Sequence, residues 1–209
     1  MEIAIPLARL PEALKDITLI TRKTKTCFPL FGLYTRFGLA SDSLIGPTRN
    51  GPVAYIEIHI LRNRQGGPVL GMPGISEIRQ LLLGKYGGQP HFGKNFPIDF
   101  SGLTTRNEKY PEFNKIALKY DKDAVFTNQF VRSFEVEYGK SVQQNSKACA
   151  VSETCLCESD MNCFEGWGCS QGAIYTPAKV CRKSKGTACH RNDECVSGKC
   201  YSASSGVCN

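Results

Sequence analysis

One short segment of this chain combines two side chains that can hold or move protons with a backbone suited to present them. Residues 89–95 read QPHFGKN, so the imidazole of His91 and the ammonium of Lys94 stand three positions apart. Pro90 stiffens the approach to this segment, and Gly93 lets the backbone pass close to a ligand. An imidazole can transfer a proton near neutral pH, and an ammonium can stabilise a developing negative charge. The segment is either a catalytic turn or an ordinary surface turn.

A second pair of candidate residues lies on a strand that the sequence predicts over residues 53–62. Apolar side chains at positions 54, 56, 58 and 60 face one side of this strand. Glu57 and His59 are two positions apart, so both point to the other side. They belong either to a solvated face or to a cleft, where they would be candidate substrate-binding residues.

The elements that must position these residues predict an α+β fold. Alternation over residues 3–7 indicates a strand, and Pro6 requires that this strand lie at an edge or end abruptly, because proline cannot donate a ladder hydrogen bond. Further expected elements are a helix from Leu10 that carries Pro11 in its first turn, an extended segment over 28–37, an amphipathic helix from Ile75 that stops at Gly87, and a helix over 108–120. This order is typical of an antiparallel sheet with helices on one face.

The cysteines divide the chain into a body and a tail. Ten of the eleven cysteines lie between Cys149 and Cys208, and the other is Cys27, which we expect to be unpaired. Cysteines so close together persist as disulfides only in oxidising surroundings, which indicates the secretory pathway or the cell exterior. A short tail cannot bury a sufficient core, so disulfides would replace hydrophobic volume. We expect a body over residues 1–138, a linker over 139–148, and a loop-dominated, disulfide-rich tail over 149–209.

The tail contains two units of four cysteines each. The members of the two units are Cys157, Cys163, Cys169 and Cys181, followed by Cys189, Cys195, Cys200 and Cys208, with Cys149 and Cys155 left over. Four cysteines allow three pairings, and spacing alone does not choose among them, although we favour first with third and second with fourth. A zinc site is the rival interpretation, but the chain has no Cys-x-x-Cys pair. We therefore expect no metal.

Charge and hydropathy limit the partners. The formal net charge is +7, and the basic residues are scattered without the stripe that nucleic-acid binding needs. We expect no nucleic-acid partner, and either a solvated basic surface or weak association with a membrane surface or a cell-wall polysaccharide. No window of eighteen apolar residues predicts a transmembrane segment. The first residues do not resemble a signal peptide, so we expect the C-terminal part of a longer precursor.

Two segments resemble a known family. Residues 84–95 read GKYGGQPHFGKN and resemble the C-terminal signature of the aldonolactone oxidoreductases, whose usual string is His-Trp-x-Lys, with Phe92 here in place of tryptophan. Residues 119–128 read KYDKDAVFTN and are similar to the Asp-Pro…Phe-x-Asn ending of that family, with Lys122 in place of proline. The resemblance extends over about residues 1–134. Plant members also carry a cysteine-rich extension, much like residues 149–181.

This resemblance implies both an activity and a set of site residues. The family, which includes L-gulono-1,4-lactone oxidase and D-arabinono-1,4-lactone oxidase, consists of flavoenzymes of the vanillyl-alcohol oxidase fold that act in ascorbate-type biosynthesis. They oxidise a hydroxyl of a sugar lactone by hydride transfer to FAD, which oxygen or another carrier reoxidises. By resemblance, the catalytic residues are Lys94, His91 and Arg36, and the residues near the cofactor are His91, Lys94 and Asn128.

One departure concerns a Glu-x-Arg pair that the family places beside the flavin. Arg36 matches the arginine, but Tyr34 stands where the glutamate is usual. A phenol does not act as a carboxylate at neutral pH. We therefore expect Tyr34 to contact substrate, and Glu57 on the neighbouring strand to act as a substitute carboxylate.

The part of the family fold that binds most of the FAD is not recognisable in these 209 residues. The sequence shows no glycine-rich phosphate loop. We expect the chain to be the cap and C-terminal region of a flavoenzyme, inactive alone. The alternative is a non-catalytic secreted binding protein that keeps the cap fold and uses its cysteine-rich tail.

Overall fold

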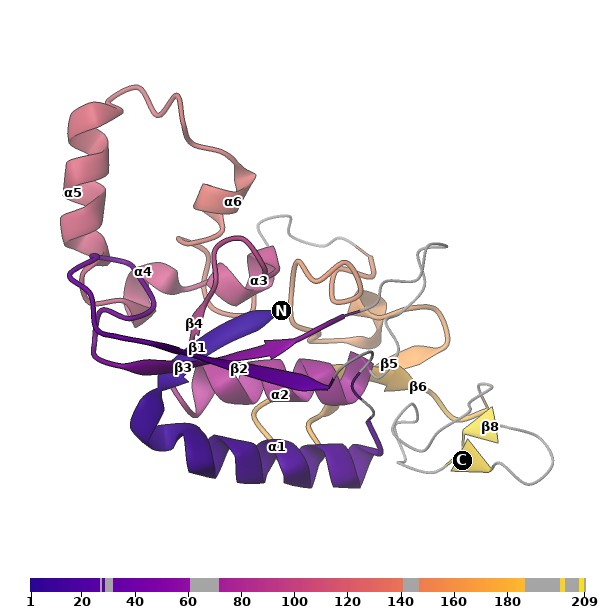
Figure 1. Cartoon of the computed structure of the whole chain (residues 1–209). Helices are drawn as coiled ribbons and strands as arrows, with labels where there is room; N and C mark the ends of the chain where they lie inside the picture. Colours follow the sequence, from indigo (N-terminus) through magenta and orange to yellow (C-terminus); the bar gives the residue numbers. More distant parts are fainter. Residues whose placement is uncertain are drawn as a thin grey trace.

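The body is built on a four-stranded sheet with the order β2-β3-β1-β4 (Figure 1). The strands are β1 (Glu2–Pro6), β2 (Leu33–Gly38), β3 (Val53–Ile58) and β4 (Gln89–Pro90), and neighbouring strands are antiparallel. The computed structural model describes residues 1–26, 28, 32–60, 72–140, 147–186, 200–201 and 207–208. The expected antiparallel sheet is confirmed.

Strand β1 lies inside the sheet, so the prediction of an edge position is wrong. It pairs with β3 on one side and with β4 on the other. The alternative prediction, an abrupt end, is correct, because Pro6 is the last residue of the strand and lies opposite Val53. The missing N–H of a terminal proline removes only the last bond of a ladder. The chain then turns through η1 (Leu7–Arg9) into the first helix.

Two helices, α1 (Leu10–Thr24) and α2 (Met72–Gly84), cover one face of the sheet (Figure 1). Apolar residues that alternate along the strands meet the helices in one core, whose fully buried members include Ile3, Ile5, Ile20, Ile56, Ile58, Ile78 and Leu82. The α+β class is therefore confirmed, and α1 and α2 are the helices that cover this face. Helix α2 has the expected apolar side, and it is buried on every side from Met72 to Leu83.

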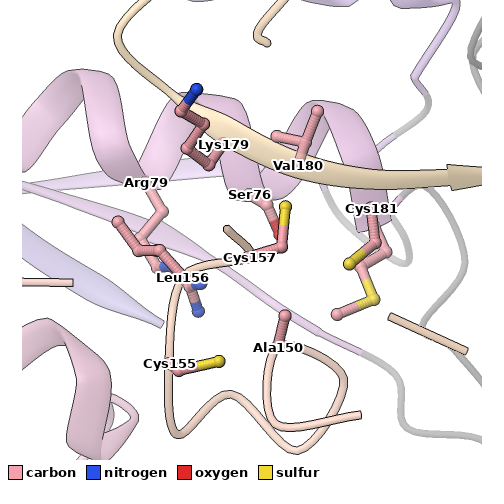
Figure 2. Close-up of a pocket in the computed structure, with 10 residues that line it drawn as sticks. Ser76, Arg79, Ala150, Cys155, Leu156, Cys157, Lys179, Val180 and Cys181 are labelled. Atoms are coloured by element: carbon pink, nitrogen blue, oxygen red, sulfur yellow. The ribbon is translucent and has the colours of Figure 1, made fainter. Parts of the chain in front are cut away.

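The tail explains why helix α2 has no exposed face. Glu77 of α2 is fully buried, and its carboxylate accepts hydrogen bonds from the backbone N–H groups of Ala173, Ile174 and Tyr175 at 2.6–2.8 Å. Gln80 donates to the carbonyl of Lys179 and accepts from its N–H. Figure 2 shows the tail against α2, where the cavity between them measures about 10 Å³. That volume is close to the minimum for one water molecule.

The tail itself contains η2 (Asp160–Asn162) and the antiparallel pair β5 (Trp167–Gln171) and β6 (Lys179–Lys183). Its disulfides are Cys149–Cys155, Cys157–Cys169 and Cys163–Cys181. The first unit thus pairs first with third and second with fourth, as we favoured.

The second cysteine unit is only partly described. Strands β7 (Cys200–Tyr201) and β8 (Val207–Cys208) pair with each other. Cys27, Cys189 and Cys195 lie outside the described residues, so their pairing stays a prediction. Residues 141–146 are outside as well, so the expected linker also stays a prediction.

After β4, the chain forms four further helices on the other side of the sheet from α1 (Figure 1). They are α3 (Pro97–Phe100), α4 (Leu103–Arg106), α5 (Tyr110–Tyr120) and α6 (Gln129–Arg132). Helix α5 begins two residues later than expected from the sequence. Between α5 and the returning chain lies an open hollow of about 740 Å³, lined in part by Phe113, Leu118 and Phe126. No helix among the described residues is long and apolar enough to cross a bilayer.

Candidate functional site

The face of the sheet opposite α1 and α2 carries a row of polar side chains. In the antiparallel register, Tyr34 of β2 lies opposite Glu57 of β3, which in turn lies opposite Glu2 of β1. Opposed residues in a sheet point to the same face, and Arg36, two positions after Tyr34, shares it. The sheet therefore brings side chains from three strands together on one surface.

The turn after β4 delivers Lys94 to this row. The N–H of His91 donates to the carbonyl of Glu2 at 3.0 Å, and the N–H of Lys94 donates to the carbonyl of His91 at 3.2 Å. The side-chain oxygen of Asn95 accepts from the N–H of Glu2 at 3.0 Å. These bonds attach both ends of the turn to β1, so its position is determined by the sheet.

Phe92 holds the other side of the same turn. Its ring stacks on Phe100 with centroids 5.3 Å apart and meets the edge of Phe134 at 6.1 Å. Both partners belong to a second small core formed around α3, α4 and α5. An aromatic residue at position 92 thus anchors the turn, which gives a structural reason why phenylalanine can stand there.

The charged groups meet at a single carboxylate. Lys94 Nζ lies 3.0 Å from Glu2 Oε2 and 3.0 Å from Glu57 Oε2. Arg36 Nη2 donates to the same Glu2 Oε2. His59 Nε2 lies 3.5 Å from Glu57 Oε1. The structure therefore brings together Lys94, Arg36, Glu57 and His59, and it centres them on Glu2, which the sequence reasoning missed.

Mutual attraction keeps these groups charged. Burial alone would raise the pKa of Glu2, but hydrogen bonds from Arg36 and Lys94 outweigh it and hold that pKa below its usual value. The hydrogen bonds to Glu2 and Glu57 raise the pKa of Lys94 above its usual value. Lys94 is therefore an ammonium at neutral pH. Its bonds to the two carboxylates use two of its three N–H donors.

Two aromatic rings lie beside the charges. Tyr34 and His59 stack with centroids 5.3 Å apart and planes inclined by 24°. The phenol ring is exposed, and it lies directly opposite Glu57 in the ladder. A carboxylate therefore stands next to the tyrosine that replaces the usual glutamate. The stacked pair offers a flat surface against which a sugar ring can pack.

His91 is near the cluster but less tightly held. Its Nε2 lies 4.0 Å from Glu2 Oε1, and its Nδ1 accepts a hydrogen bond from the N–H of Gly93 at 3.1 Å. In the neutral ring, an accepting Nδ1 leaves the proton on Nε2, so Nε2 acts as a donor. Asn128 has a different role: it is the N-cap of α6, and its side chain accepts from Val131 N at 3.0 Å.

Both cations of the charged cluster remain partly open to solvent. The side chains of Arg36 and Lys94 are 55% and 37% exposed, so both cations can still meet an anionic ligand. Neither the small cavity under the tail nor the hollow at α5 is lined by them. The candidate site is thus an open face that a second surface would have to close.

A cluster of sulfur atoms in the tail does not form a thiolate metal site in this state. The sulfurs of Cys157, Cys163 and Cys181 lie within 4.8 Å of one another. Each of them is already in a disulfide, so none is a free thiolate ligand.

Known proteins match nearly the whole described chain. A family model described as D-arabinono-1,4-lactone oxidase matches residues 1–134, and one described as L-gulonolactone oxidase 2-like, C-terminal domain, matches residues 146–183. No solved structure matches the chain.

Three relatives illustrate the extent of the similarity. L-gulonolactone oxidase 3 of Arabidopsis thaliana is 28% identical over 157 residues, which are 73% of this chain and 26% of the relative. L-gulonolactone oxidase 2 of the same plant is 26% identical over 194 residues, 88% of this chain and 32% of the relative. A third, named probable truncated L-gulonolactone oxidase 7, mitochondrial, is 23% identical over 185 residues, 86% of this chain and 73% of the relative.

The chain thus spans between a quarter and a third of the length of the first two relatives. The first family model covers well over half of the 209 residues, including every member of the charged cluster. The chain therefore belongs to the D-arabinono-1,4-lactone oxidase family, within the aldonolactone oxidoreductases.

Proposed function

We propose that this chain is the substrate-side region of an FAD-dependent sugar-1,4-lactone oxidoreductase, of the L-gulonolactone or D-arabinonolactone oxidase type. The observation that carries the proposal is the meeting of Lys94 and Arg36 with two carboxylates on one open face of the sheet. Membership of the family supports the reaction class. The substrate would be a sugar lactone, and the electron acceptor would be oxygen or another carrier.

Bound FAD would accept the hydride that leaves the hydroxyl-bearing carbon of the lactone. As that carbon is oxidised, its hydroxyl oxygen becomes a carbonyl, and the hydroxyl proton would pass to the carboxylate of Glu57, the substitute for the family's glutamate. The third N–H donor of Lys94 stabilises negative charge that develops at this oxygen. His91 donates from Nε2 to the same region, and Glu57 with His59 binds the remaining hydroxyls. Arg36, whose guanidinium is partly exposed, would bind a negatively charged part of the cofactor.

The pyrophosphate of FAD would be bound by polypeptide outside residues 1–209. Apolar side chains around the α5 hollow support the packing of such a segment: Leu118, Tyr120 and Phe126 are 53%, 78% and 80% exposed. The disulfides are consistent with the secretory pathway or the cell exterior, which we propose as the location.

The test is flavin reduction by a lactone in the assembled protein. The chain is co-expressed with the part of L-gulonolactone oxidase 3 that it does not match, and FAD is supplied. Lys94→Met should slow flavin reduction by about 100-fold, because it removes a charged donor at the developing oxyanion. Lys15→Met, on the exposed surface of α1, is the matched control and should leave the rate unchanged. Equal rates for the two variants would refute the role of Lys94.

A binding protein that keeps the cap fold without flavin is the second candidate. It is favoured by Tyr34 at the position of the usual glutamate and by the existence of a relative named as truncated. This candidate predicts that the assembled protein holds no flavin while the tail retains a cell-wall or membrane ligand. A stoichiometric FAD spectrum that is bleached by lactone excludes it.

A further inference from the structure

Glu2 is the most deeply buried member of the charged cluster. Its side chain is 0% exposed, although every group that it binds remains partly open to solvent. Oε2 binds both Arg36 and Lys94, while Oε1 has no hydrogen-bond partner among the described residues. The main chain of Glu2 also holds the turn that carries Lys94, through its N–H and its carbonyl.

Burial of the Glu2 carboxylate is not explained by a contribution to stability. Burying a carboxylate costs several kcal/mol, and a buried ion pair is often replaceable by apolar residues without loss of stability. Glu2 also lies directly opposite Glu57, and like charges at opposed positions of a ladder destabilise it. Both costs are offset because Lys94 bridges the two carboxylates and Arg36 also binds Glu2.

Those cations gain a fixed position from the arrangement. Arg and Lys side chains each carry about 2 kcal/mol of rotamer entropy, so on an open face they would sample many orientations. A rigid acceptor at the base of the sheet restricts both at once, because one oxygen accepts from both side chains. The other carboxylate oxygen of Glu2, Oε1, lies 4.0 Å from His91 Nε2.

We propose that Glu2 is the positioning residue of the site: its buried carboxylate fixes Arg36 and Lys94 side by side in the orientation in which they meet the substrate and the cofactor. This inference rests on the proposed function. Glu2 itself does not touch the reacting atoms.

The first test uses the chain alone and needs no flavin. Glu2→Gln keeps the shape of the side chain but removes the charge that Lys94 faces. The rate at which an amine reagent modifies Lys94 at pH 8, followed by mass spectrometry, should rise by about tenfold for each unit by which its pKa falls. Glu77→Gln is the matched control, because Glu77 is also a 0% exposed glutamate but binds the tail. It should lower stability without changing the reactivity of Lys94.

The second test uses the assembled enzyme. Glu2→Gln should lower kcat for the lactone by about 100-fold, as expected when a catalytic group moves by about 1 Å, with KM changed less than about threefold. Glu2→Asp keeps the charge on a shorter arm and should restore part of kcat. An unchanged kcat, or an unchanged reactivity of Lys94, overturns the positioning role.

The two tests separate this inference from the proposed function. If the assembled protein does not oxidise lactones, the proposed function fails, and the reactivity of Lys94 in Glu2→Gln still decides whether Glu2 holds the cations. If the enzyme is active and Glu2→Gln matches Glu77→Gln in both assays, the role of Glu2 is structural and the inference is wrong.

Discussion

Replacing Glu77 by glutamine should loosen the tail from helix α2 at a measurable cost in stability. The carboxylate of Glu77 accepts from three consecutive backbone N–H groups, of Ala173, Ile174 and Tyr175. It also lies 3.7 Å from the guanidinium of Arg182. Glutamine has the same shape, but it has only one acceptor oxygen and carries no charge.

The magnitude follows from these contacts. If the glutamine oxygen keeps the bonds to Ile174 and Tyr175, its amide NH₂ faces the N–H of Ala173, and that donor is left buried without a partner. A hydrogen bond to a charged group contributes about 1.5–3 kcal/mol, and an unsatisfied buried donor costs a similar amount. With the lost attraction to Arg182, we expect a destabilisation of about 2–4 kcal/mol.

Urea unfolding of the oxidised chain measures this loss. With a slope of about 2 kcal/mol per molar urea, the midpoint should fall by about 1–2 M. Glu12→Gln is the control: the side chain of Glu12 is 49% exposed and pairs with Arg9 and Lys85, so the urea midpoint should hardly change. A midpoint for Glu77→Gln equal to that of Glu12→Gln would show that the tail does not depend on this carboxylate.

Two further predictions concern the tail and α1. Replacing Cys163 and Cys181 by serine should lower the free energy of unfolding by about 3 kcal/mol, because that disulfide closes an 18-residue separation in the unfolded chain. Urea unfolding measures this loss of stability. An unchanged free energy of unfolding would contradict the loop-closure argument. Burial and a hydrogen bond to Asp16 raise the pKa of Tyr86 to about 12. In the unfolded chain this pKa is about 10, so the stability that Tyr86 contributes is complete below pH 10 and falls as the pH rises to about 12. In Tyr86→Phe, the free energy of unfolding measured across that pH range should no longer show this decrease.

Local patterns in the sequence were sufficient where neighbours along the chain determine the structure. Alternation located β3, and Pro11 with the apolar spacing located α1. The short motif around Lys94 correctly marked a turn that reaches the charged face. For β3 and α1 the determining contacts lie within one repeating pattern, whereas the turn was recognisable from its residue types although Glu2 holds it.

Long-range pairing accounts for what the sequence could not provide. Whether β1 is an edge strand depends on β4, about 87 residues later, and nothing in residues 2–6 encodes that neighbour. The importance of Glu2 has the same origin, because its partners come from β2 and from the turn after β4. That the tail covers the polar side of α2 could not be predicted either, since the covering residues lie almost one hundred positions away.

The long sequence separation between α2 and the tail residues that cover it also determines the order in which these parts can pack during biosynthesis. The ribosome completes Glu77 about 96 residues before it reaches the first backbone group that this carboxylate binds. At about 5–20 residues per second, the nascent helix waits roughly 5–20 s with its outer side chains hydrated rather than packed. Packing of α2 is therefore a late step that follows synthesis of residues 173–175, and truncated forms that stop after α6 leave this helix uncovered.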